Sequence, residues 1–400
     1  MTRIKVLIFF ILLTNIGVAQ NQLAVFYSFD NCDGTDNQNF APDAIIDGTP
    51  PCVCGVVGEG FQLDGNNDRI LLSDTLSILF EDDFTVGFYF SLDNSQGMVD
   101  LFSYRTTCDR DSSLAITYTP ITNSLRVEYA RDFTEIFELE GRLDLSKCWH
   151  QIVITKFNLE YALYLDGQLV DSEQADRIVP FGRNASLAIA NSPCLAFTQD
   201  RLSGVIDELE ILNFALSPQD ISSEFLFPDR IITDDATVFE GAQVQILTGP
   251  TCTSNIEWTP KNGMDDPFAK DPTITGDVTT DYAVAFNNGA CISRDTVRVN
   301  VIDPDVLQCE DLLLPNAFTP NNDGLNDLYG VSNRFLIENL IFFEVYNRSG
   351  SLIFSTSDLD IRWDGRFNGK PTAPGMYLYK IKYTCGGQEY LKIDNFSVIR

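Results

Sequence analysis

The sequence has 400 residues and a formal net charge of −30, and 44% of its residues are hydrophobic. At ~100–200 residues per domain, two or three domains are expected. The apolar content is enough to form cores, which excludes a globally disordered chain. The negative charge repels phosphate backbones and anionic lipid head groups, so it argues against nucleic-acid binding.

The first residues predict a targeting segment. Arg3 and Lys5 form a positive start, residues 6–13 form an apolar run, and small residues at 17–19 precede Gln20 as the expected start of the mature chain. No later apolar run approaches the ~20 residues needed to span a bilayer. We therefore expect residues 1–19 to be a signal peptide and the protein to be exported and not integral to the membrane.

Ten cysteines, an even number in an exported chain, predict disulfide bonds. No cysteine pair has the spacing of a zinc site, and the single histidine, His150, leaves little for a Cys/His zinc site or a His-based nucleophile triad. The sequence also lacks a Gly-x-Ser-x-Gly elbow, a His-Glu-x-x-His motif and a phosphate-binding glycine loop. These absences argue against the commonest kinds of catalytic centre.

Residues 23–227 predict an antiparallel β-sandwich. Short alternating runs are separated by Asp-Gly, Asn-Asn and Ser-Pro turns, and they do not alternate with helices. One helix is expected over 219–225, because Ser217 is a good N-cap and Pro218 a good first residue. The predicted strands include Leu23–Phe29, Phe84–Leu92, Leu114–Thr119, Leu125–Tyr129, Trp149–Thr155, Tyr161–Leu165 and Val205–Leu212.

Several phrases of this segment resemble the laminin-G-like, concanavalin-A-like jelly roll. The strongest is Gly204-Val205-Ile206-Asp207-Glu208-Leu209-Glu210-Ile211, followed by Ala215-Leu216-Ser217. The resemblance implies a lectin-like sandwich over residues 21–229 that recognises a glycan or an extracellular protein. The other phrases are Phe61-Gln62-Leu63-Asp64-Gly65, Phe84-Thr85-Val86, Trp149-His150-Gln151-Ile152-Val153 and Leu165-Asp166-Gly167.

Residues 230–303 predict a smaller β unit. Its pattern of Trp258-Thr259-Pro260, Thr280-Asp281-Tyr282, Cys291 and Asp295-Thr296-Val297 resembles PKD/Ig-like repeats. We expect a small sandwich that acts as a spacer. Its predicted strands are Gln243–Leu247, Asn255–Trp258, Tyr282–Phe286 and Thr296–Ile302.

Residues 304–400 contain two separated stretches rich in turn formers, followed by an alternating strand over Met376–Tyr383. Together, from about Cys309 to Arg400, they resemble the gliding-motility-associated C-terminal domain, an Ig-like sandwich. The resemblance implies recognition by the type IX secretion machinery and a location in the medium or on the outer surface of a Gram-negative bacterium. The sorting-motif residues are Pro315, Phe318, Pro320, Asn321, Asp323, Gly324, Asn326, Asp327, Trp363, Asp364, Gly365, Gly369, Gly375 and Tyr377.

The turn-rich stretch Asn321–Asp327 also has a simpler interpretation, which does not depend on the resemblance. Loops rich in Asn and Asp are usually turns, and calcium is the minor alternative. The EF-hand pattern fails, because counting from Thr319 places Gly330 rather than Glu at the twelfth position. We therefore expect a turn motif here.

The function expected from these resemblances is binding without catalysis. The main alternative is a jelly-roll glycoside hydrolase, whose catalytic strand reads Glu-x-Asp-x-x-Glu, but Ile206–Glu210 lacks the leading Glu and has the wrong spacing. A purely structural surface component is the third hypothesis. Sugar-stacking aromatics are candidates too, although strand alternation should turn half of them into the core: Tyr104, Tyr118, Tyr129 and Tyr164.

A structural Ca²⁺ is expected at Asp30, which ends the first strand, and Asp207, which lies in the last. First and last strands are often neighbours in this fold, and carboxylate oxygens suit Ca²⁺. The alternative is a pair of solvated or hydrogen-bonded aspartates. For disulfides, we expect each small domain to hold one, Cys252–Cys291 and Cys309–Cys385. Fifteen pairings remain for the other six cysteines, among which Cys108–Cys148 and Cys32 with Cys52 or Cys54 are favoured.

Overall fold

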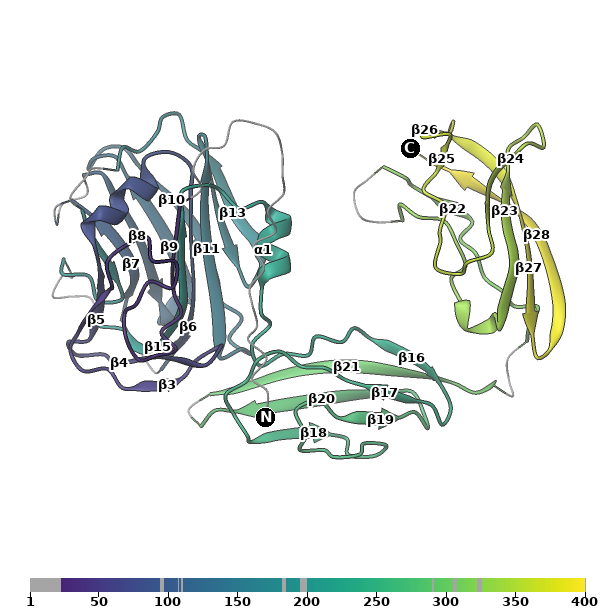
Figure 1. Cartoon of the computed structure of the whole chain (residues 1–400), viewed down its shortest axis with the longest axis horizontal. Helices are drawn as coiled ribbons and strands as arrows, with labels where there is room; N and C mark the ends of the chain where they lie inside the picture. Colours follow the sequence, from purple (N-terminus) through teal and green to yellow (C-terminus); the bar gives the residue numbers. More distant parts are fainter. Residues whose placement is uncertain are drawn as a thin grey trace. The chain divides into compact units, whose positions relative to one another are not determined.

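The computed structural model describes residues 23–399 except 94–96, 107, 109–110, 182–184, 195–199, 290, 305–307 and 322–325. The chain forms two compact units, residues 1–300 and 301–400, and nearly all of its regular structure is β (Figure 1). The expected signal peptide at 1–19 and the motif residues Asp323 and Gly324 lie outside the described residues. Among the described helices, none is long and apolar enough to cross a membrane.

The first unit begins with a sandwich of two antiparallel sheets, as the sequence predicted (Figure 1). One sheet contains β1 (Ala24–Tyr27), β3 (Cys52–Cys54), β4 (Glu59–Asp64), β6 (Phe84–Leu92), β11 (Trp149–Phe157), β12 (Glu160–Leu165), β13 (Gln168–Gln174) and β15 (Ser203–Leu212). Its strand order is β13-β12-β11-β6-β15-β4-β3, and β1 also pairs with β15. The first and last strands of the sandwich are therefore neighbours.

The second sheet of the sandwich has the order β10-β9-β8-β7-β14-β5-β2. The apolar residues that alternate along both sheets meet in one large core between them. The strands of the second sheet are β2 (Ile45–Asp47), β5 (Arg69–Leu72), β7 (Val99–Arg105), β8 (Ser113–Thr119), β9 (Ser124–Ala130), β10 (Ile136–Gly141) and β14 (Ser186–Ile189).

Strands β6 and β11 are buried on both faces because a further layer covers the first sheet. Helix α1 (Pro218–Glu224) lies on this outer face, where Ile221 packs against Val153 and Tyr164. The helix begins as predicted, since the Ser217 hydroxyl accepts from the Asp220 N–H and the Asp220 carboxylate accepts from the Ser217 N–H. The linker that follows α1 covers the neighbouring part of the sheet through Phe225.

The small β unit belongs to the same compact unit as the sandwich. It has a four-stranded sheet with the order β16-β21-β20-β18 and the pair β17-β19, around the fully buried Trp258. The strands are β16 (Ala236–Phe239), β17 (Gln243–Gln245), β18 (Ile256–Thr259), β19 (Thr273–Thr275), β20 (Thr280–Asn287) and β21 (Ile292–Ile302).

Two disulfides, Cys54–Cys252 and Cys148–Cys291, join the small β unit to the sandwich. The predicted Cys252–Cys291 bond is therefore wrong. Its premise was that each small domain closes its own disulfide, but Cys291 lies beside the start of β11, where the Ser293 hydroxyl accepts a hydrogen bond from the Cys148 N–H. The small β unit is thus covalently fixed to the sandwich rather than held by a linker alone.

Of the other three predicted disulfides, two are confirmed and one is wrong. Cys32–Cys52 and Cys309–Cys385 form as expected. The predicted Cys108–Cys148 bond is wrong, because Cys148 is taken by the small β unit and Cys108 pairs with Cys194. Cys108 and Cys194 follow β7 and β14, which are hydrogen-bonded neighbours, and a sequence does not reveal that adjacency.

The second unit is built on one five-stranded sheet with the order β22-β28-β27-β23-β24 and a short hairpin, β25-β26. One face of the sheet packs on a core that contains Phe318, Trp363 and Tyr377. The predicted strand Met376–Tyr383 lies within the long β27. The strands are β22 (Ala317–Phe318), β23 (Asn339–Tyr346), β24 (Leu352–Thr356), β25 (Arg366–Phe367), β26 (Lys370–Pro371), β27 (Gly375–Cys385) and β28 (Gln388–Val398).

Candidate functional site

The two separated stretches of the sorting motif meet in the core of the second unit. The Phe318 ring lies 5.4 Å from the Trp363 ring, and Trp363 lies 5.5 Å from Tyr377. A Cβ on Gly365 would lie 2.7 Å from the Pro320 ring, so the glycine permits the close approach of the two stretches. These motif residues therefore build the fold of the unit.

The described part of the turn-rich stretch is fixed by hydrogen bonds. The Asp327 carboxylate accepts from the Asn321 N–H at 2.8 Å, and the Asn326 carbonyl accepts from the Thr319 N–H at 3.0 Å. Asn326 has a φ of 54°, a left-handed conformation that Asn tolerates. Residues 322–325 lie outside the described residues, so the turn expected over Asn321–Asp327 stays a prediction.

The structure brings both predicted metal ligands to one loop, residues 54–59. The Asp207 carboxylate accepts hydrogen bonds from the N–H groups of Val56 at 2.6 Å and Val57 at 3.3 Å, and Asp30 accepts from the Glu59 N–H at 3.2 Å. The loop approaches both carboxylates so closely that side chains do not fit at its glycines. A Cβ would lie 2.2 Å from Asp207 at Gly55 and 1.9 Å from Asp30 at Gly58.

Burial and the repulsion between neighbouring carboxylates disfavour the charged forms of the acidic groups at this loop site. Burial raises the pKa of Asp207 to about 8, with the Val57 and Val56 N–H groups lowering it and Asp30 raising it. Burial also raises the pKa of Glu208 to about 9, and the charges of Asp207 and Asp30 raise it further. Within the described part of the chain, the second carboxylate oxygen of Asp207, Oδ1, is buried without a hydrogen-bond partner.

A cation bound at this loop would need ligands besides side chains. Among the described residues, one group of three His, Cys, Asp or Glu ligand atoms falls within 4.8 Å, at Cys32, Cys52 and Glu59. The two cysteines of that group are bonded to each other, so it is not a metal site. A cation between Asp30 and Asp207 would therefore have two side-chain ligands, and backbone carbonyls or water would complete its coordination.

The carboxylates of β15 do not form an open acidic pair. A β-bulge interrupts the pairing of β15 with β6 between Asp207 and Glu210, and Glu208 has a φ of 52°. Bulges re-aim side chains. Asp207 is fully buried and Glu208 is 9% exposed, so water and a polysaccharide have little access to either.

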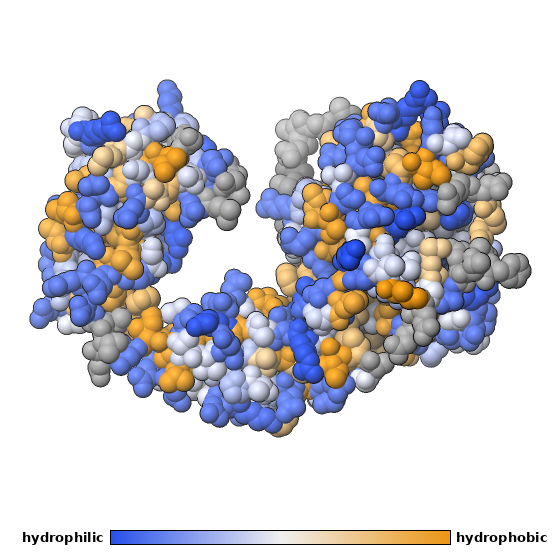
Figure 2. Space-filling view, turned by 180° about the vertical axis from the view of Figure 1, so that it is seen from behind, coloured by the Kyte–Doolittle hydropathy of each residue, from blue (hydrophilic) through white to orange (hydrophobic). Residues whose placement is uncertain are grey.

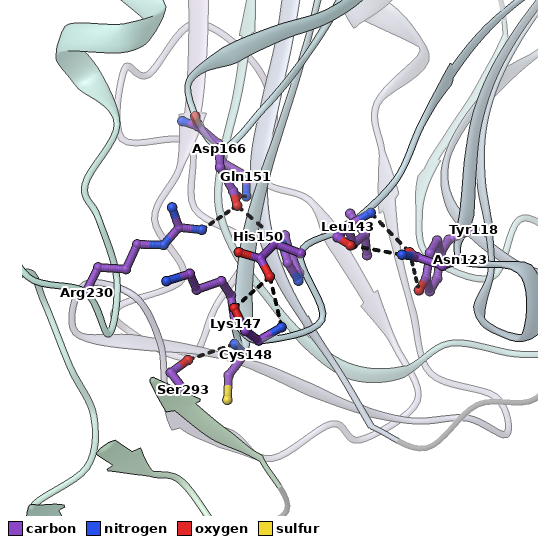
Figure 3. A network of polar contacts seen from close by, with 12 residues as sticks. Tyr118, Asn123, Leu143, Lys147, Cys148, His150, Gln151, Asp166, Arg230 and Ser293 are labelled. Carbon is purple, nitrogen blue, oxygen red and sulfur yellow. Dashed lines mark hydrogen bonds and ion pairs between the residues drawn. The ribbon is translucent and has the colours of Figure 1, made fainter. Parts of the chain in front are cut away.

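The single histidine belongs to a polar network that joins the sandwich to the small β unit (Figure 3). His150 is buried, and its Nδ1 lies 3.5 Å from Asp166, whose carboxylate also accepts from the Gln151 N–H and pairs with Arg230 at 2.6 Å. Burial alone would raise the pKa of Asp166, but His150, Gln151 and Arg230 together lower it. The Arg230 guanidinium also lies 5.5 Å above the Phe225 ring.

This network gives the phrase Leu165-Asp166-Gly167 a structural role that sequence reasoning missed. Asp166 and Gly167 turn the chain between β12 and β13 with φ values of 50° and 76°. Phe225 packs on Gly167, where a Cβ would lie 3.0 Å from its side chain. The turn thereby anchors the linker between the sandwich and the small β unit.

The proposed sugar-stacking tyrosines are not available at the surface. Tyr104, Tyr118, Tyr129 and Tyr164 are 0%, 2%, 0% and 5% exposed. Strand alternation predicted that half of them would face outward. The first three point into the core, and Tyr164, on the outer face, is covered by α1. None of the four is a stacking platform for a ligand.

Comparison with protein families identifies both main parts of the chain. Residues 64–222 match Laminin_G_3, described as the concanavalin A-like lectin/glucanases superfamily, and residues 312–394 match CHU_C, the Type IX secretion signal domain. The chain carries a concanavalin-A-like domain and a type IX secretion signal domain. The type IX secretion signal domain supports export to the medium or the cell surface. No curated protein matches the chain.

Solved structures resemble this chain at low similarity. Domain 4 of AbnA, a GH43 arabinanase from Geobacillus stearothermophilus in complex with arabinotriose, is 20% identical, with a TM-score of 0.42 over 50% of this chain and 96% of that one. The Ruminococcus gnavus sialidase CBM40 bound to sialyllactose is 12% identical, with a TM-score of 0.37 over 42% and 96%. The binding domain of botulinum neurotoxin serotype C1 is 12% identical, with a TM-score of 0.43 over 94% of each chain. None of these likenesses bears on the function of this chain.

Proposed function

We propose that this protein is an exported binding protein. Its concanavalin-A-like domain recognises a glycan or an extracellular protein without turnover, and its type IX secretion signal domain directs export and display at the outer surface of the cell. The observation that carries the proposal is the presence of a lectin-like domain and a type IX secretion signal domain in one chain.

The state of the β15 carboxylates supports binding rather than hydrolysis. A retaining hydrolase needs one ionised nucleophile and one acid on an open face, ~5–5.5 Å apart. Here burial raises the pKa of Asp207 to about 8 and that of Glu208 to about 9, which disfavours the ionised form that a nucleophile needs. Asp207 faces the 54–59 loop, and Glu208 is 9% exposed.

The charge of the first unit narrows the class of ligand. Residues 301–400 contain 9 Lys/Arg and 13 Asp/Glu, a net charge of −4, so residues 1–300 carry −30 + 4 = −26. A surface of this charge raises the cost of approach for polyanions at moderate salt. We therefore propose a neutral or cationic extracellular polymer as the ligand.

We propose in addition that Ca²⁺ binds between Asp30 and Asp207 and stabilises the sandwich without taking part in chemistry. The partnerless buried oxygen of Asp207 and the exposed carboxylate of Asp30 are hard oxygen ligands, which Ca²⁺ prefers. A cation would also neutralise the charges that raise the pKa of Glu208. Its effect would be to tie β15 to the 54–59 loop.

The test of the binding proposal is to immobilise the full chain and challenge it with neutral glycans, cationic polymers and sulfated polysaccharides over a salt series. Retention of a neutral or cationic polymer, with no reducing ends released over time, is the expected result. Preferential retention of the sulfated set would refute the charge argument. Release of reducing ends would replace the binding protein with the jelly-roll hydrolase.

A further inference from the structure

The outer face of β27 and β28 in the second unit carries four exposed apolar side chains among polar ones. Met376 and Leu378 of β27 are 50% and 41% exposed, and Leu391 and Ile393 of β28 are 54% and 53% exposed. The two strands pair without a register shift, so alternate residues of each share this face. The alternate residues on the other face form the core, namely Tyr377, Tyr379, Ile381, Tyr383, Phe396 and Val398.

A hollow of about 460 Å³ lies at one end of this face, between the turn after β23 and the start of β27. Tyr346, Met376 and Leu378 form apolar parts of its lining, and Arg348 lies beside them. A Cβ on Gly375 would lie 2.5 Å from the Arg348 guanidinium, so the glycine leaves room for that side chain. Hydrophobic side chains gather in patches on the surface of this unit (Figure 2).

The charge of this face differs from that of the rest of the chain. Arg348 and Lys380 line the hollow, and neither forms an ion pair with any residue that the structure describes. Glu389 pairs with Lys382 at 2.5 Å, and Glu344, which accepts from the Tyr346 hydroxyl at 2.7 Å, stands opposite Lys380 in the pairing of β23 with β27. The face therefore presents Arg348 without an ion pair in the described part of the chain, and Lys380, whose Nζ lies 5.1 Å over the Phe342 ring, beside an apolar hollow within a protein of net charge −30.

We propose that this face is the surface through which the type IX secretion signal domain docks on a partner protein of the export machinery, a partner that inserts an apolar side chain into the hollow and places carboxylates beside Arg348 and Lys380. The proposal rests on the export role argued above. The four exposed apolar side chains of β27 and β28 favour an apolar protein side chain as the occupant over a sugar. A second copy of this chain fits less well, because a twofold contact centred on the hollow would bring Arg348 and Lys380 near their own copies.

The experiment uses full-length variants in the cells that export the protein. Leu378→Ser tests the apolar surface, with Leu313→Ser as its control because Leu313 is 58% exposed and does not line the hollow. Lys380→Glu tests the charge, with the exposed Lys370→Glu as its control because it changes the net charge equally. The exported fraction of each variant is measured, together with its thermal unfolding midpoint. The chain truncated after Asp303 is run alongside.

We expect Leu378→Ser and Lys380→Glu each to lower the exported fraction at least tenfold with unchanged unfolding midpoints, while both controls and Lys380→Arg are exported normally. Normal export of Leu378→Ser and Lys380→Glu, with retention of the truncated chain, would overturn the docking face alone. Export of the truncated chain would overturn the sorting role as well. A wild-type dimer in sedimentation that Leu378→Ser dissociates would show that the face joins two copies instead.

Discussion

The disulfides Cys54–Cys252 and Cys148–Cys291 should make the sandwich and the small β unit unfold as one body. They close loops with sequence separations of 198 and 143 residues. In the chain-entropy model, a loop of either size stabilises the folded state by ~5 kcal/mol. The two contributions do not add fully, because the second bond closes a loop that the first has already shortened. Replacing all four cysteines by Ser should therefore cost at least ~5 kcal/mol.

The assay is differential scanning calorimetry of the full chain. For a domain of this size ~1 kcal/mol corresponds to ~2–4 °C, so the midpoint of the first unit should fall by ~10–20 °C. Without the covalent bonds, the junction keeps polar contacts, such as the Arg230–Asp166 pair and the Cys148–Ser293 hydrogen bond, and a small apolar cluster around Phe225. We therefore expect the single transition of the first unit to split into two.

The control is the variant with Ser at both Cys309 and Cys385, which removes a disulfide of the second unit. It should leave the transition of the first unit unchanged. An unchanged transition in the four-cysteine variant would refute the argument that the disulfides hold the two parts together. Peptide mapping without reduction provides an independent check, and a Cys252–Cys291 peptide would contradict the pairing on which the argument depends.

Three further predictions follow from the buried carboxylates. Ca²⁺ at 100 times its dissociation constant should stabilise the wild type by ~2.7 kcal/mol in thermal melts, and Asp207→Ala should lose that gain; an equal gain in both proteins would contradict the site. Asp100→Asn should raise the free energy of unfolding by ~3 kcal/mol at pH 7, measured by urea unfolding, because burial raises the pKa of Asp100 from 3.8 to about 6. The wild type loses its stabilising proton as the pH rises through 6, and Asn does not. A gain at pH 7 no larger than the gain at pH 4 would count against this prediction. The pKa of Asp166 is lowered, so the stability that comes from its contacts with His150 and Arg230 is present near neutral pH and is lost as the pH falls through that pKa. Asp166→Asn should therefore cost ~3 kcal/mol at pH 7 and weaken the loss of stability at acid pH. An unchanged loss of stability at acid pH would refute the role of these contacts.

The fold could be predicted well because its signals are local. Phe84–Leu92 was predicted from alternation and turn residues and is β6 in the structure, and Ser217 was recognised as an N-cap from its residue type. The meeting of Phe318 with Trp363 is a long-range contact, and it was reached through the resemblance of the two motifs.

The sites were harder to predict because they depend on adjacency between distant segments. The loop with Gly55 and Gly58 was not recognised as the partner of Asp30 and Asp207, although two glycines close together are a signal of tight backbone approach. The pairing of Cys54 with Cys252 requires knowing that the small β unit folds back on the sandwich. Burial of the tyrosines on both faces likewise depends on the layer formed by α1, which alternation along a strand does not reveal.

The central claim is that the first unit binds the polymer and the second unit directs export. It is tested most directly by comparing the full chain with the chain truncated after Asp303, in one experiment with two readouts. One readout is the fraction of protein that reaches the medium or the cell surface, and the other is retention of purified protein on the polymer that the full chain binds. The account predicts that the truncated chain binds the polymer with the same affinity and is not exported. A truncated chain that is exported at normal yield, or that no longer binds, would contradict it.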